Sequence, residues 1–203
     1  MKDFLIDFET LGTDANSVVI DLSIVVFDID EISTLEDLIT SGKKIKFSIK
    51  DQKALGRTVS ESTLEWWKNQ SKEARMALVP REDDFTVEEG IKEFLRFVET
   101  QGITDKSHGW CRGMSFDFPI LKSLIAHVFE DPDQYIPCKF WNQRDVRTAI
   151  EAYALNRNFK DVPLPKGALD NFVAHNSLSD CAKDVLYLQY SKAYALGKLD
   201  IPE

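Results

Sequence analysis

FLIDFET, residues 4–10, places two acidic residues inside a short apolar run near the start of the chain. A short run of this composition predicts a β-strand. Successive side chains of a strand point to opposite faces, so Asp7 and Glu9 share one face. Burying an ionised carboxylate is costly unless a partner offsets the charge. Two interpretations stay open: an exposed strand end with solvated acids, or a buried acidic pair that a cation neutralises.

Two further strands are predicted outward from this stretch. The first is the long β-rich run SVVIDLSIVVFDI, residues 17–29, and the second is the alternating run KIKFSIK, residues 44–50. Turn residues lie around the segment that separates these two runs. We expect the three strands to form an antiparallel meander.

Helices and strands alternate in the rest of the chain. Ser62 with Glu65 predicts a capping box that opens a helix over 63–79, and Thr86 with Glu89 predicts another that opens a helix over 87–100. The later elements are predicted as strands over 107–113 and 138–146, and as helices over 117–129, 146–155, 168–173 and 178–196. Pro119 is compatible with the helix over 117–129 because it falls in the first turn.

This order of elements predicts an α/β fold. Three antiparallel strands followed by parallel strands form a mixed sheet, and helices cover it. The arrangement resembles the ribonuclease H-like architecture. A chain of 203 residues with 43% hydrophobic residues can bury one full-sized core, so we expect a single domain over residues 1–203.

Composition excludes several classes of protein. No apolar run is long enough to span a membrane, and the acidic N-terminal stretch does not resemble a signal peptide. The three cysteines are widely separated and form no CxxC motif, which fits a reducing compartment and argues against a thiolate zinc site: Cys111, Cys138 and Cys181. We therefore expect a cytoplasmic protein, in the host cytoplasm if a phage encodes it.

Charge is unevenly distributed along the chain. The net charge of -9 argues against a protein that coats nucleic acid electrostatically, but not against an enzyme that reaches phosphates through bound cations. Residues 43–53 hold five lysines and one acid, and residues 139–166 hold six basic and three acidic residues. Each basic run is either a solvated face or a set of contacts to a nucleic-acid backbone.

Three more residues are candidates for the same site as the first acidic pair. Asp117 follows a predicted strand that ends in glycine, although an acid at a helix start is also favoured by the helix dipole. His175 and Asp180 are five residues apart, which does not place them on one helical face. His175 is therefore predicted in the loop before the last helix. Asp180 could instead pair with Ser177 in a capping-type pattern.

The remaining acids and aromatics have simpler interpretations. Five acidic residues are expected to serve turns, strands or helix starts: Asp14, Asp21, Asp145, Asp170 and Asp184. Trp66 and Trp67 could stack on nucleic-acid bases, but paired tryptophans on a helix more often pack in a core. His108 and His127 are expected to be structural or surface residues.

Taken together, three motifs resemble a known family. DFET at 7–10, SFDFPIL at 115–121 and HNSLSD at 175–180 resemble, in this order, the exonuclease motifs of the DEDDh family of DnaQ-like 3′–5′ exonucleases. The five-residue spacing from His175 to Asp180 is typical of the DEDDh branch. The resemblance covers nearly the whole chain, and four longer stretches resemble phage members of the family: residues 62–75, 109–121, 137–148 and 164–167.

The resemblance implies a reaction and a role for each motif residue. Two divalent cations, Mg²⁺ or Mn²⁺, would be held by four carboxylates: Asp7, Glu9, Asp117 and Asp180. The family pattern makes His175 the general base, and it places Thr10 and Leu11 against the terminal nucleotide. The substrate would be the 3′ end of a single strand, DNA rather than RNA, and the product a 5′-mononucleotide. The alternatives are an exoribonuclease of the same fold and a non-catalytic nucleic-acid binding module.

Overall fold

A computed structural model describes residues 2–202 and contains one five-stranded sheet. The strands are β1 (Asp3–Thr10), β2 (Val19–Phe27), β3 (Lys43–Lys46), β4 (Gly109–Cys111) and β5 (Gln143–Asp145). Their order across the sheet is β3-β2-β1-β4-β5. The pairs β1–β2 and β2–β3 are antiparallel, whereas β1–β4 and β4–β5 are parallel. The predicted mixed α/β sheet is confirmed.

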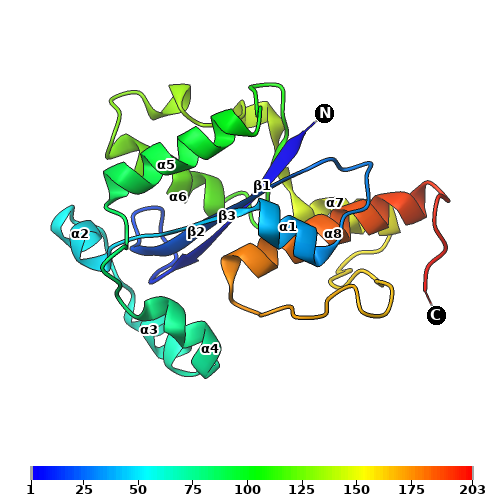
Figure 1. Ribbon diagram of the computed structural model, residues 1–203, viewed down its shortest axis with the longest axis horizontal. Helices are drawn as coiled ribbons and strands as arrows, with labels where there is room; N and C mark the ends of the chain where they lie inside the picture. Colours follow the sequence, from blue (N-terminus) through cyan, green and yellow to red (C-terminus); the bar gives the residue numbers. More distant parts are fainter. Residues whose placement is uncertain (1, 203) are drawn as a thin grey trace.

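Helices cover both faces of this sheet (Figure 1). The helices α5 (Val87–Thr100) and α6 (Asp117–Ala126) lie on one face, and α1 (Leu35–Ser41), α7 (Val146–Ala154) and α8 (Ser177–Ala195) lie on the other. The short helices α3 (Glu61–Lys68) and α4 (Lys72–Arg75) lie together at one end of the molecule. The remaining helical elements are α2 (Ile49–Ala54) and the 3₁₀ turns η1 (Met76–Leu78), η2 (Pro132–Gln134) and η3 (Phe140–Asn142).

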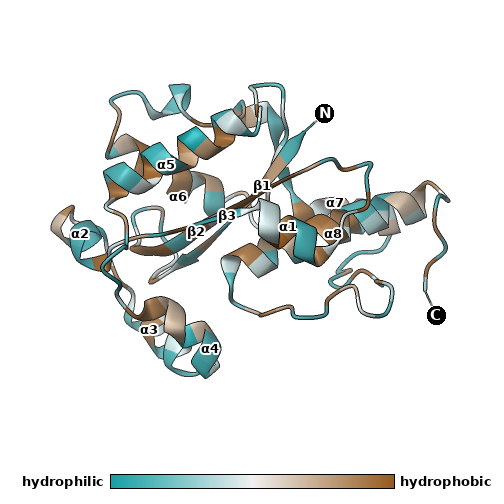
Figure 2. Ribbon diagram, viewed as in Figure 1, coloured by the Kyte–Doolittle hydropathy of each residue, from teal (hydrophilic) through white to brown (hydrophobic). Residues whose placement is uncertain are grey.

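Strand β1 separates two apolar cores by the alternation of its side chains. Phe4, Ile6 and Phe8 belong to the core that α5 and α6 cover, whereas Leu5 belongs to the core that α8 covers. The odd-numbered face therefore points toward α8. Figure 2 shows hydrophobic and hydrophilic stretches alternating along the helices around the sheet. Asp7 and Glu9 lie on that odd-numbered face, as the sequence predicted.

The ladder between β1 and β2 is regular up to the acidic pair. Asp3 lies opposite Phe27, and the pairing continues without interruption to Glu9 opposite Asp21. Thr10 then lies opposite Val19, so one residue of β2 is skipped at this point. Such a bulge increases the local twist and bends the strand.

Two predicted strands and one predicted helix are shorter in the structure. The third strand stops at Lys46 rather than at residue 50, since Ser48 accepts a hydrogen bond from the Asp51 amide and opens α2. The strand predicted over 138–146 is limited to β5, because its first half forms η3. Helix α6 ends at Ala126, earlier than the predicted residue 129.

The helix predicted over 63–79 is wrong in both its start and its continuity. Ser60, not Ser62, occupies the N-cap of α3, and no capping box forms with Glu65. Helix α3 then ends at Lys68, with Asn69 as its C-cap. A new helix, α4, begins because the Ser71 side chain accepts a hydrogen bond from the Ala74 amide. The second capping box, Thr86 with Glu89, is confirmed at the start of α5.

Two other segments depart from the predictions. The helix predicted over 168–173 is a series of turns, because Gly167 and Asn171 have φ values of 86° and 67° that a right-handed helix does not accommodate. Helix α1 was not predicted, although Thr34 accepts a hydrogen bond from the Asp37 amide as an ordinary N-cap. Within residues 2–202, no helix is long and apolar enough to cross a membrane.

Candidate active site

The predicted acidic residues meet where β1 lies between the first turns of α6 and α8. Asp7 and Glu9 come from β1, Asp117 is the first residue of α6, and Asp180 lies in the first turn of α8. Burial raises the pKa of the Asp7 carboxyl well above its ordinary value, and the charges of the other three acids raise that pKa further. The structure therefore brings all four carboxylates into one electrostatic cluster.

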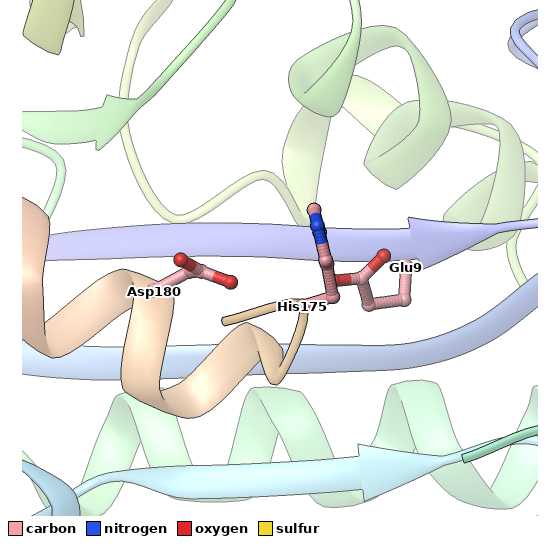
Figure 3. A group of neighbouring side chains, drawn as sticks. All are labelled: Glu9, His175 and Asp180. Atoms are coloured by element: carbon pink, nitrogen blue, oxygen red, sulfur yellow. The ribbon is translucent and has the colours of Figure 1, made fainter. Parts of the chain in front are cut away.

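Three of the predicted residues are close enough to share one ion. The nearest ligand atoms of Glu9, His175 and Asp180 all lie within 4.8 Å of one another. Figure 3 shows that Glu9 projects from β1, Asp180 from the first turn of α8, and His175 from the short loop just before that helix. A hard divalent cation prefers carboxylate oxygens, so the two carboxylates of this group, Glu9 and Asp180, fit Mg²⁺ or Mn²⁺.

Asp117 is placed by the tight turn that follows β4. Gly113 has a φ of 136°, a conformation that L-residues rarely adopt, and its carbonyl accepts hydrogen bonds from the amides of Phe116 and Asp117. Pro119 then falls in the first turn of α6, where its missing N–H has no helical acceptor in any case. Asp117 is only 2% exposed, and burial raises its pKa to about 7. An acid that served only the helix dipole would gain nothing from such burial.

Asp180 is not the partner of a capping serine. Asn176 is the N-cap of α8, and its side chain accepts a hydrogen bond from the Leu178 amide. The Ser177 hydroxyl points away, toward β2. The alternative capping interpretation of Asp180 is therefore wrong, and its carboxylate instead contacts Lys183 Nζ at 3.0 Å, within the acidic cluster.

His175 lies in the loop before α8, as predicted, and packs against a tryptophan. Its φ of 59° is left-handed, and its ring meets the ring of Trp66 edge-on at 5.0 Å between centroids. Trp66 is 43% exposed, whereas Trp67 is buried and donates a hydrogen bond from Nε1 to the Thr10 carbonyl at 2.8 Å. Trp67 is thus a core residue, and Trp66 belongs to the wall of the site.

Thr10 is the last residue of β1, and Leu11 follows it directly. The Thr10 hydroxyl donates to the Gly12 carbonyl at 2.6 Å, and Leu11 is 5% exposed because it packs in a small core with Trp67. Helix α3 therefore fixes the backbone just beyond Glu9. Their contact with a nucleotide stays a prediction.

Asp21 is a buried neighbour of the site that the sequence interpretation missed. It lies opposite Glu9 in the β1–β2 ladder, accepts a hydrogen bond from the Ser177 hydroxyl, and contacts Lys44 Nζ at 3.0 Å. Ser177 also shares a hydrogen bond with Ser23 at 2.7 Å. This network ties the start of α8 to β2 and β3. Its signal was visible in the sequence: like Asp7, Asp21 interrupts an otherwise apolar strand.

Asp184 is the second buried acid that the sequence interpretation set aside. Its carboxylate forms a two-pronged ion pair with Arg112, at 2.9 Å from Nε to Oδ2 and 2.7 Å from Nη2 to Oδ1. Asp184 lies one turn after Asp180, and its charge reaches Asp7. Arg112 thus balances the charge of Asp184 and links the residue after β4 to α8.

The free energy of unfolding of the metal-free protein should decrease as the pH rises from about 5 to about 8. Burial, helped by the charges of Asp21, Asp180 and Asp117 and opposed by Lys44, raises the pKa of Glu9 from 4.5 to about 8. Between the unfolded and folded pKa values the folded protein binds more protons than the unfolded chain, so the free energy of unfolding decreases with pH. Calorimetric Tm values at pH 5, 6, 7 and 8 in EDTA measure this trend.

The same titration with Mg²⁺ or Mn²⁺ provides the control. Cations bind the ionised carboxylates and release their protons, so they should stabilise the protein increasingly toward pH 8. A metal-free Tm that rises across this range, or a cation effect that shrinks with pH, would contradict the acidic cluster as the cause.

Comparison with known proteins gives the family of this chain. Residues 2–191 match the model of the 3′-5′ exoribonuclease Rv2179c-like domain. The chain belongs to this Rv2179c-like family. It is also 48% identical, over 214 aligned positions, to the exodeoxyribonuclease of Enterobacteria phage T4, and the match covers 100% of this chain and 94% of that protein. The family model and the phage relative thus identify this Rv2179c-like chain as a 3′–5′ exonuclease, the kind of enzyme that the motifs implied.

Solved structures share the fold of this Rv2179c-like chain at low identity. The zinc-bound complex of E. coli exonuclease I with single-stranded DNA superposes with a TM-score of 0.58 at 13% identity, covering 95% of this chain. Cell-death related nuclease 4 superposes with a TM-score of 0.57 at 16% identity, covering 97% of this chain and 64% of the other. The chain spans 40% of the exonuclease I chain, so that comparison shows the shared fold alone.

Proposed function

We propose that the protein removes 5′-mononucleotides from the 3′ end of single-stranded DNA, with two divalent cations and His175 as general base. The observation that carries this proposal is the convergence of five motif residues on one end of β1, in a chain that matches a 3′–5′ exonuclease family over residues 2–191. No single acid here is diagnostic, but four carboxylates around one point repel each other unless cations balance them.

The residues of the site support hydrolysis of a phosphodiester. Bound cations would lower the pKa of the attacking water and stabilise the leaving 3′-oxygen. His175 would take the proton of that water on a ring nitrogen, and the ring of Trp66 packs against the His175 ring. Asp7, Glu9, Asp117 and Asp180 would hold the cations. Thr10 and Leu11 are proposed to contact the terminal nucleotide.

The comparisons support two different nucleic acids as substrate. The family model is named for an exoribonuclease, whereas the phage T4 relative is an exodeoxyribonuclease that aligns over the whole chain at 48% identity. We choose DNA because this relative is similar along the entire chain. The carboxylates engage phosphate, which both polymers share, so discrimination must come from contacts to the 2′ position of the sugar. An exoribonuclease is the second candidate.

The choice of DNA is tested by kcat/KM on matched single-stranded DNA and RNA of one sequence, at identical salt and Mg²⁺. We expect faster hydrolysis of DNA. Faster hydrolysis of RNA would overturn the choice of polymer and leave the proposed chemistry in place. Binding without hydrolysis of either strand would favour the non-catalytic binding module instead.

Digestion should require a free 3′ hydroxyl. The cluster can hold one terminal phosphate, and the net charge of -9 offers little to hold a long duplex. Strands labelled at the 5′ end should shorten progressively from the other end in Mg²⁺, and EDTA should stop the reaction. A 3′ phosphate or circularisation should also prevent digestion. Rapid cutting of single-stranded circles would indicate an endonuclease and contradict the proposal.

A further inference from the structure

Two aromatic side chains next to β5 are unusually exposed. Phe140 is 75% exposed and Trp141 is 61% exposed, more than any other aromatic side chain in residues 2–202. Their rings pack edge-to-face with 4.8 Å between centroids. Both lie in η3, in the basic run 139–166 that the proposed chemistry does not use. Large apolar groups held in water at this exposure are typical of a binding surface.

The pair forms one side of a cleft of about 620 Å³. Met114, Phe118 and Pro119 line the same cleft, and these residues bracket Asp117 in the sequence. The cleft therefore starts beside the turn that positions a proposed metal-binding carboxylate.

The charges around this cleft are mainly positive in an otherwise acidic chain. Lys122 and Lys139 line it, and the acid among its lining residues, Asp133, is paired with Lys122 at 2.7 Å. Arg147 lies beside the cleft, because its Nη1 atom is within 3.5 Å of the position that a Cβ on Gly113 would take. Lys139 and Arg147 add positive charge that the Lys122–Asp133 pair does not balance, and this charge is complementary to a phosphate backbone.

Trp141 is also held in place before any ligand arrives. The Arg144 guanidinium donates hydrogen bonds from Nη1 to the Trp141 carbonyl at 2.7 Å and to the Gln143 carbonyl at 2.9 Å. A third hydrogen bond, from the Asn142 side chain to the Asp105 carbonyl at 2.9 Å, anchors the same turn to the loop before β4. An exposed aromatic on a fixed turn loses little entropy on binding.

We propose that this cleft binds the single strand on the 5′ side of the terminal nucleotide, with bases stacked on Phe140 and Trp141 and phosphates near Lys139 and Arg147. The proposal rests on the proposed exonuclease function. Aromatic faces stack on any base, so the cleft adds affinity without sequence preference. It thereby favours oligonucleotides over dinucleotides, whose length does not reach η3.

The test compares a long and a short substrate in the variant Phe140→Ala/Trp141→Ala. Stacking is worth roughly 1–3 kcal/mol per base, which corresponds to about 5- to 150-fold in affinity. We expect KM for a single-stranded 12-mer of thymidylate to rise by at least about fivefold, with kcat nearly unchanged. Hydrolysis of the thymidylate dinucleotide should stay within about twofold of wild type. Ile201→Ala removes another exposed apolar side chain, 63% exposed, and is the matched control.

Binding measured without hydrolysis separates this proposal from the proposed function. Fluorescence anisotropy of the labelled 12-mer in EDTA should show the same weakening in the double variant, and Trp141→Phe should largely restore binding. If the wild-type protein does not degrade 3′ ends but its binding of the 12-mer still depends on Phe140 and Trp141, the proposed function is wrong. The proposal that this cleft binds a single strand would then still hold.

Three outcomes would contradict the proposal that the cleft binds the single strand. The first is an unchanged KM on the 12-mer. The second is an equal loss on the dinucleotide, which would mean a structural role for the pair. The third is a wild-type dimer, seen by light scattering, that the double variant abolishes while it still binds the 12-mer normally, which would assign the aromatic pair to a second copy of the chain.

Discussion

Replacing Asp117 with alanine should reduce the exonuclease rate by about 10³-fold or more while the fold persists. A carboxylate that holds a catalytic cation contributes several kcal/mol to the transition state, and each 1.36 kcal/mol is a factor of ten in rate. Burial raises the pKa of Asp117 to about 7, so its ionised form is unfavourable in the metal-free protein. Asp117→Ala should therefore raise the Tm in EDTA at pH 8, even as it lowers Mn²⁺ affinity in calorimetry.

The controls for this variant come from the other acids of the chain. Asp145→Ala removes an acid whose side chain caps α7 through the Thr148 amide, so it should cost about 1 kcal/mol of stability and little activity. Asp184→Ala is not a neutral control, because it leaves Arg112 half-buried without its carboxylate. An active Asp117→Ala beside an inactive Asp145→Ala would contradict the assignment of the site.

His175→Ala should lose about 10²–10⁴-fold in rate and keep most of its affinity for Mn²⁺. Positioned proton transfer contributes a factor of this size, whereas loss of a metal ligand would lower the affinity itself. The distinction matters because the donor atoms of His175, Glu9 and Asp180 lie within 4.8 Å of one another. Calorimetry with Mn²⁺ decides between the two roles, and a collapse of affinity would make His175 a ligand.

A second histidine variant controls for surface effects. His108 is 40% exposed and lies near Asp3, with 3.6 Å between Nδ1 and Oδ2. It precedes β4, away from the loop that carries His175. His108→Ala should leave both the rate and the metal affinity close to wild type. A loss as large as that of His175→Ala would mean that the assay reports stability rather than proton transfer.

The features that sequence predicted well are those set by alternation along a strand. Apolar residues on both faces of β1 identify it as an inner strand, and the period of two then places Asp7 and Glu9 together. The antiparallel order of the first three strands is also confirmed. The combination of motifs, rather than any one motif, identified the family.

The features that sequence predicted poorly depend on polar side chains competing for backbone groups. The segment around residues 60–79 contains several serines that could each start a helix, and only the three-dimensional packing of Trp67 beneath Thr10 selects Ser60 and Ser71. Likewise, Ser177 could have capped α8, but the buried carboxylate of Asp21 binds its hydroxyl. Short sequence patterns do not show which of several polar side chains will be drawn to a partner that is distant in the sequence.

The roles of two acids around the site were likewise not predictable from short sequence patterns. Asp21 and Asp184 looked like ordinary strand and helix residues, because their partners, Lys44 and Arg112, are distant in sequence. Trp66 and Trp67 are adjacent in sequence yet differ in their surroundings. Trp67 is buried in the core, whereas Trp66 packs against His175. Pairings of this kind are visible only once the fold is known.

The bulge where β2 skips one residue opposite Glu9 and Thr10 has a consequence for how this enzyme can diversify. Glu9 is the last side chain whose direction is set by the uninterrupted ladder, and Thr10 is the first beyond it. The directions of the two carboxylates therefore depend on the pairing register of β1 with β2. This register tolerates little change, because a shift of one residue would turn both acids into the opposite apolar core. The exposed tip of the hairpin, residues 13–16, lies past this break. It can accumulate substitutions while the two acids of the ladder stay in place.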